Sequence, residues 1–337
     1  MAQKEPKVTA SIDLDGKGKQ FGHLAVPHSR DDSAWGAVHV PIVSIRSGDG
    51  PTVVFTGGNH GDEYEGPIAL MKLARALEPG EINGQVILLP TLNHPAAMAG
   101  TRVSPIDGVN MNRAFPGHRD GTVTQMIAHY VQHSILPRCD ALADIHSGGR
   151  TLMFSPFAAY HRLTDEALTA RARAAVEAFG APIGLELVEL DAEGMLDSAV
   201  EELGKVFVST ELGGGGTATV DTVALAETGL RNLLAHFGVT DAWPTTPEAR
   251  GQMPTRMMHM PDSGCFAIAN DYGIWEPLAD LGWTVAPGDA LGQMHFPERP
   301  EREPALYSAA AAGTIIGRTH KQLIEPGDFL ALIARDL

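Results

Sequence analysis

Continuous apolar runs alternate with amphipathic segments through the first 240 residues of the chain. The apolar runs carry β-branched residues and lack a polar face, as strands buried on both faces of a sheet do; they cover 52–56, 85–89, 141–145 and 206–210. Between and after them, apolar residues recur at helical spacing in 66–77, 124–136, 168–179 and 220–237. This order predicts an α/β fold with a doubly wound, mixed but mostly parallel sheet.

Both ends of the chain follow a different pattern. Short β-like runs at 22–27 and 37–43 predict an N-terminal β segment within residues 1–50. After a proline-rich stretch at 243–247, short β-like pieces separated by glycine and proline continue to residue 337. We therefore expect a larger domain over 1–245 and a smaller, all-β barrel or sandwich domain over 250–337.

The composition of the chain makes some partners and locations unexpected. The chain has 25 Lys and Arg against 41 Asp and Glu, a formal net charge of −16, and it has no basic cluster. Nucleic acid and anionic membranes are therefore not expected as partners. The polar N-terminus lacks the features of a secretory signal and no apolar run reaches the roughly 18 residues of a membrane span, so we expect a cytoplasmic protein. Whether identical chains assemble into oligomers stays open.

A histidine and a glutamate lie three residues apart where the strand at 52–56 gives way to a helix, in the segment 57–63, Gly-Gly-Asn-His-Gly-Asp-Glu. His60 and Glu63 therefore predict half of a zinc site, because zinc takes imidazole nitrogen and carboxylate oxygen. A third ligand is expected at the carboxyl end of another parallel strand, and His146 follows the strand at 141–145. Asp144 shares a strand face with His146 and is placed to orient its ring.

A catalytic zinc site also needs a proton acceptor that is not a ligand. Glu211 ends the strand at 206–210 and precedes four glycines, and we assign it as the general base. The glycines are not a phosphate-binding loop, because no Gly-Lys-Ser/Thr follows them.

Four motifs in order resemble those of the succinylglutamate desuccinylase/aspartoacylase family, which is related to the zinc carboxypeptidases. They are GNHGDE at 58–63, NMNRAFPG at 110–117, DIHSG at 144–148 and TELG at 210–213. The resemblance implies one zinc ion held by His60, Glu63 and His146, with Glu211 as the catalytic glutamate. It also implies that residues 1–245 form a zinc hydrolase domain.

The polar segment between the two metal motifs holds arginines suited to an anionic substrate. Arg102 and Arg113, with Asn112, are candidates for binding a carboxylate or a developing oxyanion. The resemblance implies that Arg102 polarises the scissile carbonyl, and that Asn112 and Arg113 hold the substrate carboxylate.

Within the family, the N-terminal β segment and the residues of the motifs are most similar to those of N-acetyl-2,4-diaminobutyrate deacetylases of ectoine degradation. This implies a small-molecule N-acyl amino acid as substrate and hydrolysis of a linear amide bond. Such a substrate carries an ammonium group. We assign no residue to it, because the acidic stretch that could bind it is better explained as a solvated face; its members are Glu186, Glu189, Asp191, Glu193, Asp197, Glu201 and Glu202.

Three alternatives remain from the sequence. The chain could be a deacylase for another substrate of the succinylglutamate or acetylaspartate type, a zinc carboxypeptidase acting on peptides, or a non-catalytic protein that binds carboxylates. A serine hydrolase is not expected, because no Gly-x-Ser-x-Gly follows a predicted strand.

Overall fold

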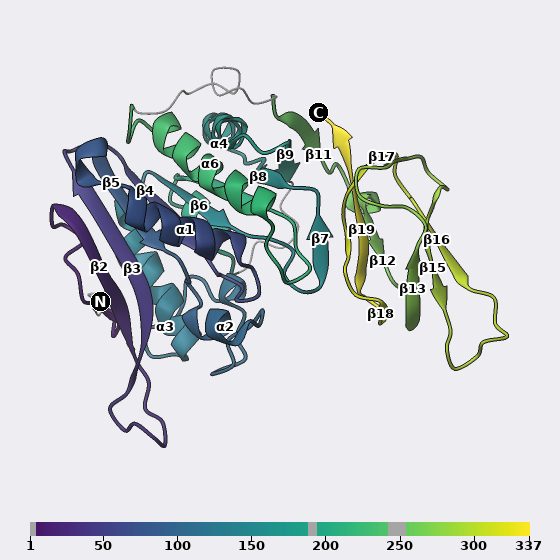
Figure 1. The fold of residues 1–337 in the computed structure, drawn as a ribbon, viewed down its shortest axis with the longest axis horizontal. Helices are drawn as coiled ribbons and strands as arrows, with labels where there is room; N and C mark the ends of the chain where they lie inside the picture. The colour runs from purple at the N-terminus through teal and green to yellow at the C-terminus, as the bar shows by residue number, and fades with distance from the viewer. Residues whose placement is uncertain (1–4, 188–193, 242–253) are drawn as a thin grey trace.

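The structure is a computed structural model that describes residues 5–187, 194–241 and 254–337. An α/β body, coloured purple to green in Figure 1, is flanked on one side by the C-terminal strands, coloured green to yellow. The predicted boundary at 243–247 lies outside the described residues, so the division into 1–245 and 250–337 stays a prediction.

One mixed sheet forms the centre of the body and continues into the C-terminal strands. From one edge to the other its strands are β1 (Thr9–Ala10), β2 (Gly18–Pro27), β3 (Ala37–Ser47), β5 (Gly84–Leu89), β4 (Thr52–Gly57), β6 (Ala141–Ile145), β10 (Val206–Glu211), β8 (Phe157–His161), β9 (Ile183–Leu187), β11 (Arg256–His259), β19 (Phe329–Asp336), β17 (Gly313–Thr319) and β14 (Thr284–Val285). Strands β5, β4, β6 and β10 are parallel, so their carboxyl ends meet at one edge. The predicted doubly wound, mixed sheet is confirmed.

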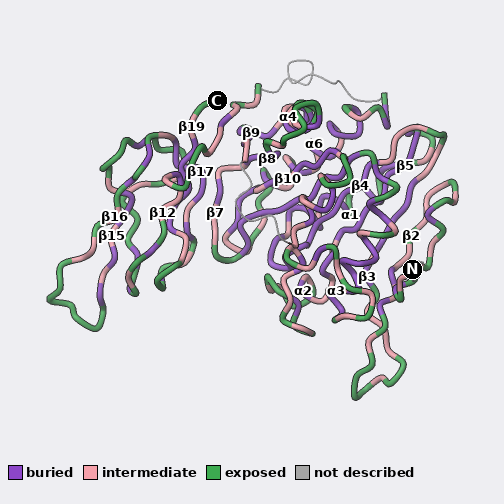
Figure 2. Tube along the Cα trace, turned by 180° about the vertical axis from the view of Figure 1, so that it is seen from behind, coloured by how far each residue is buried: buried purple, intermediate pink, exposed green. Residues whose placement is uncertain are grey.

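Helices cover both faces of the parallel strands (Figure 1). Side chains of α1 (Glu65–Ala76), α4 (Glu166–Phe179) and α6 (Val220–His236) share one apolar core, and those of α3 (Val123–Tyr130) and α5 (Leu196–Glu201) share the other. Alternate residues of β4 enter these two cores, because successive strand side chains point to opposite faces. Val53 and Phe55 therefore lie in the first core and Val54 in the second. Figure 2 shows this buried interior of the body.

The helix predicted over 124–136 is not a single α-helix. After α3 the chain continues as a π-helical turn over Val131–Ile135 and a 3₁₀ turn over Leu136–Arg138. Pro137 lies in this 3₁₀ turn, and regular α-helix cannot continue through it because proline has no backbone N–H to donate to the preceding turn.

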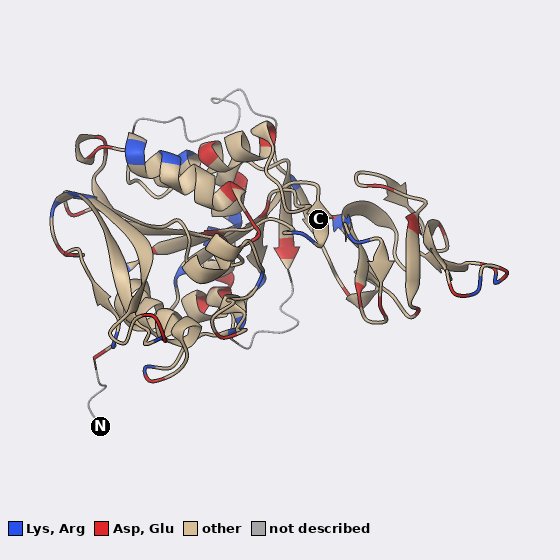
Figure 3. Ribbon diagram, turned by 60° about the horizontal axis from the view of Figure 1, so that its bottom comes forward, with Lys and Arg blue, Asp and Glu red and all other residues tan. Residues whose placement is uncertain are grey.

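The C-terminal strands form two antiparallel layers, in a region that the sequence predicts to be an all-β barrel or sandwich. One layer contains β19, β17 and β14 with β12 (Phe266–Ile268); the other contains β16 (Ala305–Ser308), β15 (Ala290–His295), β13 (Gly273–Pro277) and β18 (Leu323–Ile324). A short strand of the body, β7 (Leu152–Phe154), pairs with β17. Acidic and basic residues are interspersed over the body and the C-terminal strands (Figure 3). Among the described helices none is both long and apolar enough to span a membrane.

Candidate metal centre

Three predicted ligands meet at the carboxyl ends of β4 and β6. His60 Nδ1 lies 2.8 Å from Glu63 Oε1, and His146 Nδ1 lies 2.8 Å from Glu63 Oε2. One ligand atom from each residue lies within 4.8 Å of the others, and all three residues are buried. His60 and Glu63 are three positions apart in the sequence, and His146 is 83 positions beyond Glu63. The parallel pairing of β4 with β6 brings the three residues together.

The charges of this cluster suit a bound cation. Burial lowers the pKa of His60. Burial alone would raise the pKa of Glu63, but the two imidazoles hold it well below its usual range. His60 Nε2 is buried and has no hydrogen-bond partner among the described residues. Two imidazoles and one carboxylate form a donor set that zinc takes with a fourth position left for water, so the residues present fit a zinc ion.

Asp144 holds the His146 ring from the side opposite Glu63. Its Oδ2 lies 2.7 Å from His146 Nε2, and it accepts hydrogen bonds from Thr56 Oγ1 at 2.6 Å and Asn59 Nδ2 at 2.7 Å. Burial opposes charge on His146, but the carboxylates of Asp144 and Glu63 raise its pKa well above the ordinary value. The sequence reasoning identified Asp144 and missed Thr56 and Asn59. Only the register of the β4–β6 pair, which places Thr56 opposite Asp144, could have indicated Thr56.

Glu211 is the last residue of β10, and the residue after it is hydrogen-bonded to the metal-ligand residue His146. The backbone N–H of Leu212 donates to the His146 carbonyl at 3.1 Å. Burial, and then the charge of Glu63, raise the pKa of Glu211 to about 8. Its Oε2 is buried without a hydrogen-bond partner in the described part of the chain. A carboxylate with raised proton affinity beside a metal centre is suited to proton transfer near neutral pH.

Arg102 contacts the cluster from the loop after α2 (His94–Ala99). One of its guanidinium nitrogens, Nη1, lies 3.4 Å from His60 Nδ1 and 3.8 Å from Glu63 Oε1. Its side chain is half exposed, so the guanidinium is accessible to a molecule that approaches the metal ligands. The structure therefore brings together His60, Glu63, His146 and Arg102.

Asn112 and Arg113 lie in a 3₁₀ turn, Met111–Arg113. Asn112 Oδ1 accepts from the backbone N–H of Leu196 at 3.0 Å, and the side chain of Asn110 caps the turn. Arg113 Nη1 donates to the carbonyl of Asn112 at 2.7 Å. The first residue of α5 thus orients the Asn112 amide, whose nitrogen can donate elsewhere.

The acidic stretch between Glu186 and Glu202 is only partly described. Glu189, Asp191 and Glu193 lie outside the described residues. Glu186 accepts a hydrogen bond from Tyr160 at 2.8 Å, and Glu201 lies 3.1 Å from His161 Nδ1. These two carboxylates therefore have protein partners at the end of β8.

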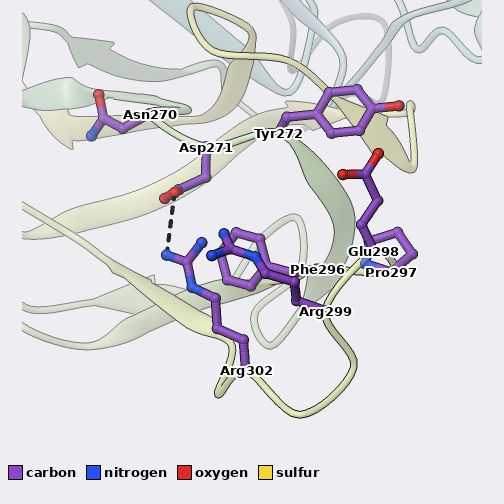
Figure 4. Close-up of a pocket in the computed structure, with 8 residues that line it drawn as sticks. All are labelled: Asn270, Asp271, Tyr272, Phe296, Pro297, Glu298, Arg299 and Arg302. Atoms are coloured by element: carbon purple, nitrogen blue, oxygen red, sulfur yellow. Dashed lines mark ion pairs between the residues drawn. The ribbon is translucent and has the colours of Figure 1, made fainter.

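A separate hollow of about 270 Å³ lies among the C-terminal strands and contains none of the predicted site residues (Figure 4). The Arg302 guanidinium stacks on the Phe296 ring, 3.5 Å from its centroid, and pairs with Asp271 at 3.7 Å. Asp271 Oδ2 also accepts a hydrogen bond from Tyr307. These contacts hold the loop between β15 and β16 against the segment before β13.

Comparisons with known proteins identify the family of the chain. The family model for the succinylglutamate desuccinylase/aspartoacylase catalytic domain matches residues 49–237. An Nα-acetyl-L-2,4-diaminobutyric acid deacetylase of Halomonas elongata is 42% identical over 332 residues, covering 98% of this chain and 96% of that protein.

Two solved structures have the same fold over nearly the whole chain. The product-bound ectoine utilization protein EutE (DoeB) of Ruegeria pomeroyi is 46% identical with a TM-score of 0.95, covering 99% of this chain and all of the other. A succinylglutamate desuccinylase of Silicibacter sp. TM1040 is 45% identical with a TM-score of 0.94, again covering 99% and 100% of the two chains.

Proposed function

Because the chain belongs to the succinylglutamate desuccinylase/aspartoacylase family, we propose that it is a zinc-dependent deacylase that removes the acetyl group of Nα-acetyl-L-2,4-diaminobutyrate. The observation that carries the reaction is the buried group His60, Glu63 and His146 with Glu211 on the adjoining strand. The observation that carries the substrate is the 42% identity to a deacetylase of that name over 98% of this chain.

The three ligands would hold the zinc ion, with Asp144 orienting His146. A bound zinc ion lowers the pKa of a bound water from 15.7 to about 7 and polarises a carbonyl. This function requires a base close to the ligands, because the proton of the attacking water must leave as its oxygen bonds to the carbonyl carbon.

Glu211 would perform both proton transfers. Its Oε2 has no partner among the described residues, so it is available to take the water proton. When the amide C–N bond breaks, Glu211 returns that proton to the leaving amine nitrogen. The products are acetate and L-2,4-diaminobutyrate, and the carboxylate is restored for the next turnover.

Two groups would bind the substrate on either side of the scissile bond. Arg102 would donate to the carbonyl oxygen as negative charge develops there, and its contacts with the ligand residues support this role. Asn112 and Arg113 would bind the α-carboxylate, and the Leu196 N–H that anchors the Asn112 oxygen leaves its NH₂ group to donate.

The test is a substrate panel with a metal analysis on the purified protein. We expect about one zinc per chain by mass spectrometry, loss of activity with dipicolinate and recovery with added zinc. Acetate release from Nα-acetyl-L-2,4-diaminobutyrate should have the highest kcat/KM, compared with N-acetylaspartate, N-succinylglutamate and a C-terminally free peptide. Protein without stoichiometric metal that dipicolinate does not inhibit would contradict the metal-dependent function. A higher kcat/KM for another amide would reassign the substrate.

A further inference from the structure

The loop after Glu211 is formed by four glycines that no other residue could replace without strain. Gly213, Gly214, Gly215 and Gly216 all have positive φ, between 67° and 146°. A methyl group built on Gly214 would lie 2.0 Å from the carbonyl oxygen of Leu152. The glycines therefore allow backbone of this loop to approach backbone of β7 directly.

Backbone hydrogen bonds join this glycine loop, residues 213–216, to the segment that follows His146. The Gly213 carbonyl accepts from the N–H groups of Gly148 at 3.1 Å and Phe154 at 3.0 Å, and the Gly215 N–H donates to the Leu152 carbonyl at 2.9 Å. The position of the loop after Glu211 is thus coupled to that of β7.

The C-terminal strands hold β7 from its other side. In the antiparallel β7–β17 pair, Gly317 lies opposite Phe154, and the Ser155 N–H donates to the Ile316 carbonyl at 2.9 Å. A methyl group built on Gly317 would lie 2.5 Å from the Phe154 ring, so the two strands are in close contact. Figures 1 and 2 both show β7 between the body and the C-terminal strands.

His320, just beyond β17, reaches the glycine loop itself. Its backbone N–H donates to the Thr151 carbonyl at 2.7 Å. Its ring lies over Gly215, since a methyl group built there would be 3.1 Å from His320 Nε2. His320 lies about 170 positions beyond His146 in the sequence. It nevertheless contacts both the loop that follows His146 and the loop that follows Glu211.

We propose that β17 and His320 are positioning elements for catalysis: through β7 and the glycine loop, the C-terminal strands hold Glu211 in register with the metal ligands. This inference rests on the proposed function, because it assumes that Glu211 is the base. A displacement of about 1 Å in a reacting group can lower a rate about 100-fold, so a remote strand that prevents it contributes to turnover. The C-terminal strands would then affect the rate of the chemical step, in addition to any effect on the access of substrate to the site.

The first test compares two histidines of the C-terminal part of the chain, exposed His320 and half-buried His295. His320→Ala removes the ring over Gly215, whereas His295→Ala removes a ring that pairs with Glu276 in the other layer. We expect His320→Ala to lower kcat by about 3-fold to 10-fold with KM and zinc content unchanged, and His295→Ala to match the wild type. An unchanged kcat in His320→Ala, or an equal loss in both variants, would overturn the assignment of His320.

The second test separates positioning from loss of stability. Gly317→Ala would press on Phe154 of β7, and Gly292→Ala would press on Trp275, 2.2 Å from the added methyl, within the other layer. We expect about a 10-fold or greater loss of kcat in Gly317→Ala only, after assay temperatures are matched to each variant's Tm. Equal kcat in the two folded variants would overturn the role of β17. A wild type inactive on every amide would instead refute the proposed function.

Discussion

Thr210 and His146 are joined by two hydrogen bonds. The backbone N–H of His146 donates to Thr210 Oγ1 at 3.0 Å, and the hydroxyl donates to the His146 carbonyl at 3.1 Å. Thr210 is fully buried and immediately precedes Glu211. One hydroxyl therefore connects the strand of a metal ligand with the strand of the proposed base.

Thr210→Val should lower both stability and metal affinity. Valine keeps the branched shape but leaves the buried His146 N–H without its partner, which costs about 1–3 kcal/mol in the free energy of unfolding. Thr210→Ser, which keeps the hydroxyl, should remain close to the wild type. Urea unfolding and zinc titration of both variants measure this, and a Thr210→Val protein as stable as Thr210→Ser contradicts it.

Glu211→Gln should abolish turnover and leave zinc bound. Glutamine has nearly the same shape but cannot accept the water proton, and Glu211 is not one of the three ligands. Zinc content by mass spectrometry and kcat on the preferred amide give the two readouts. Normal turnover in this variant would show that another group is the base.

The activity of the wild type should fall as the pH drops. Burial and the charge of Glu63 raise the pKa of Glu211 from 4.5 to about 8, and only its deprotonated form can accept a proton. A bound cation opposes this shift, so we expect the acidic limb of log(kcat/KM) between pH 4.5 and 8. A profile that stays flat down to pH 4 would be inconsistent with Glu211 as the base.

Arg102 should affect kcat more than KM. Loss of an aligned oxyanion donor costs on the order of 2.7–4 kcal/mol in transition-state stabilisation, about 100-fold to 1000-fold in kcat, for Arg102→Ala. Arg102→Lys should lose less, because it keeps the charge without the planar guanidinium. Arg30→Ala is the control, since Arg30 pairs with Asp32 in the loop between β2 and β3. A change confined to KM would assign Arg102 to ground-state binding.

Much of the fold follows from short-range sequence patterns. The strand at 52–56 has apolar residues at consecutive positions, which predicts that both of its faces are buried. Accordingly, β4 contributes Val54 to one core and Phe55 to the other. His60 and Glu63 are close along the chain, so local geometry alone brings them together. His146 requires only the rule that parallel strands present their carboxyl ends at one edge.

Other features depend on pairings that no local pattern encodes. Strand β7 has three residues and pairs with β17, more than 150 positions later, so neither its length nor its periodicity marks it as a strand. The partners of Asp144 depend likewise on the register of β4 against β6. For the same reason the motifs indicated Glu211 but not the glycine-loop contacts that hold the residues after it.

Asp107 connects the loop that carries Arg102 and Asn112 with helix α3. Its Oδ2 accepts from the Thr124 N–H at 2.8 Å and its Oδ1 from the Thr124 hydroxyl at 2.9 Å, at the helix N-terminus where a carboxylate is favourable. Burial alone would raise the pKa of Asp107, but the hydrogen bonds from Thr124 and Val109 hold it below its usual value.

The stability that Asp107 contributes should therefore disappear in acid. A carboxyl group with a lowered pKa in the folded state stabilises it fully above its unfolded pKa of about 3.9, and this contribution is lost as the pH falls through the folded pKa. Asp107→Asn should cost about 1 kcal/mol at pH 7, as for a lost helix cap, and less at pH 3. Urea unfolding of both proteins at the two pH values measures the difference. A difference that is equal at both would mean that shape rather than charge at Asp107 stabilises the loop.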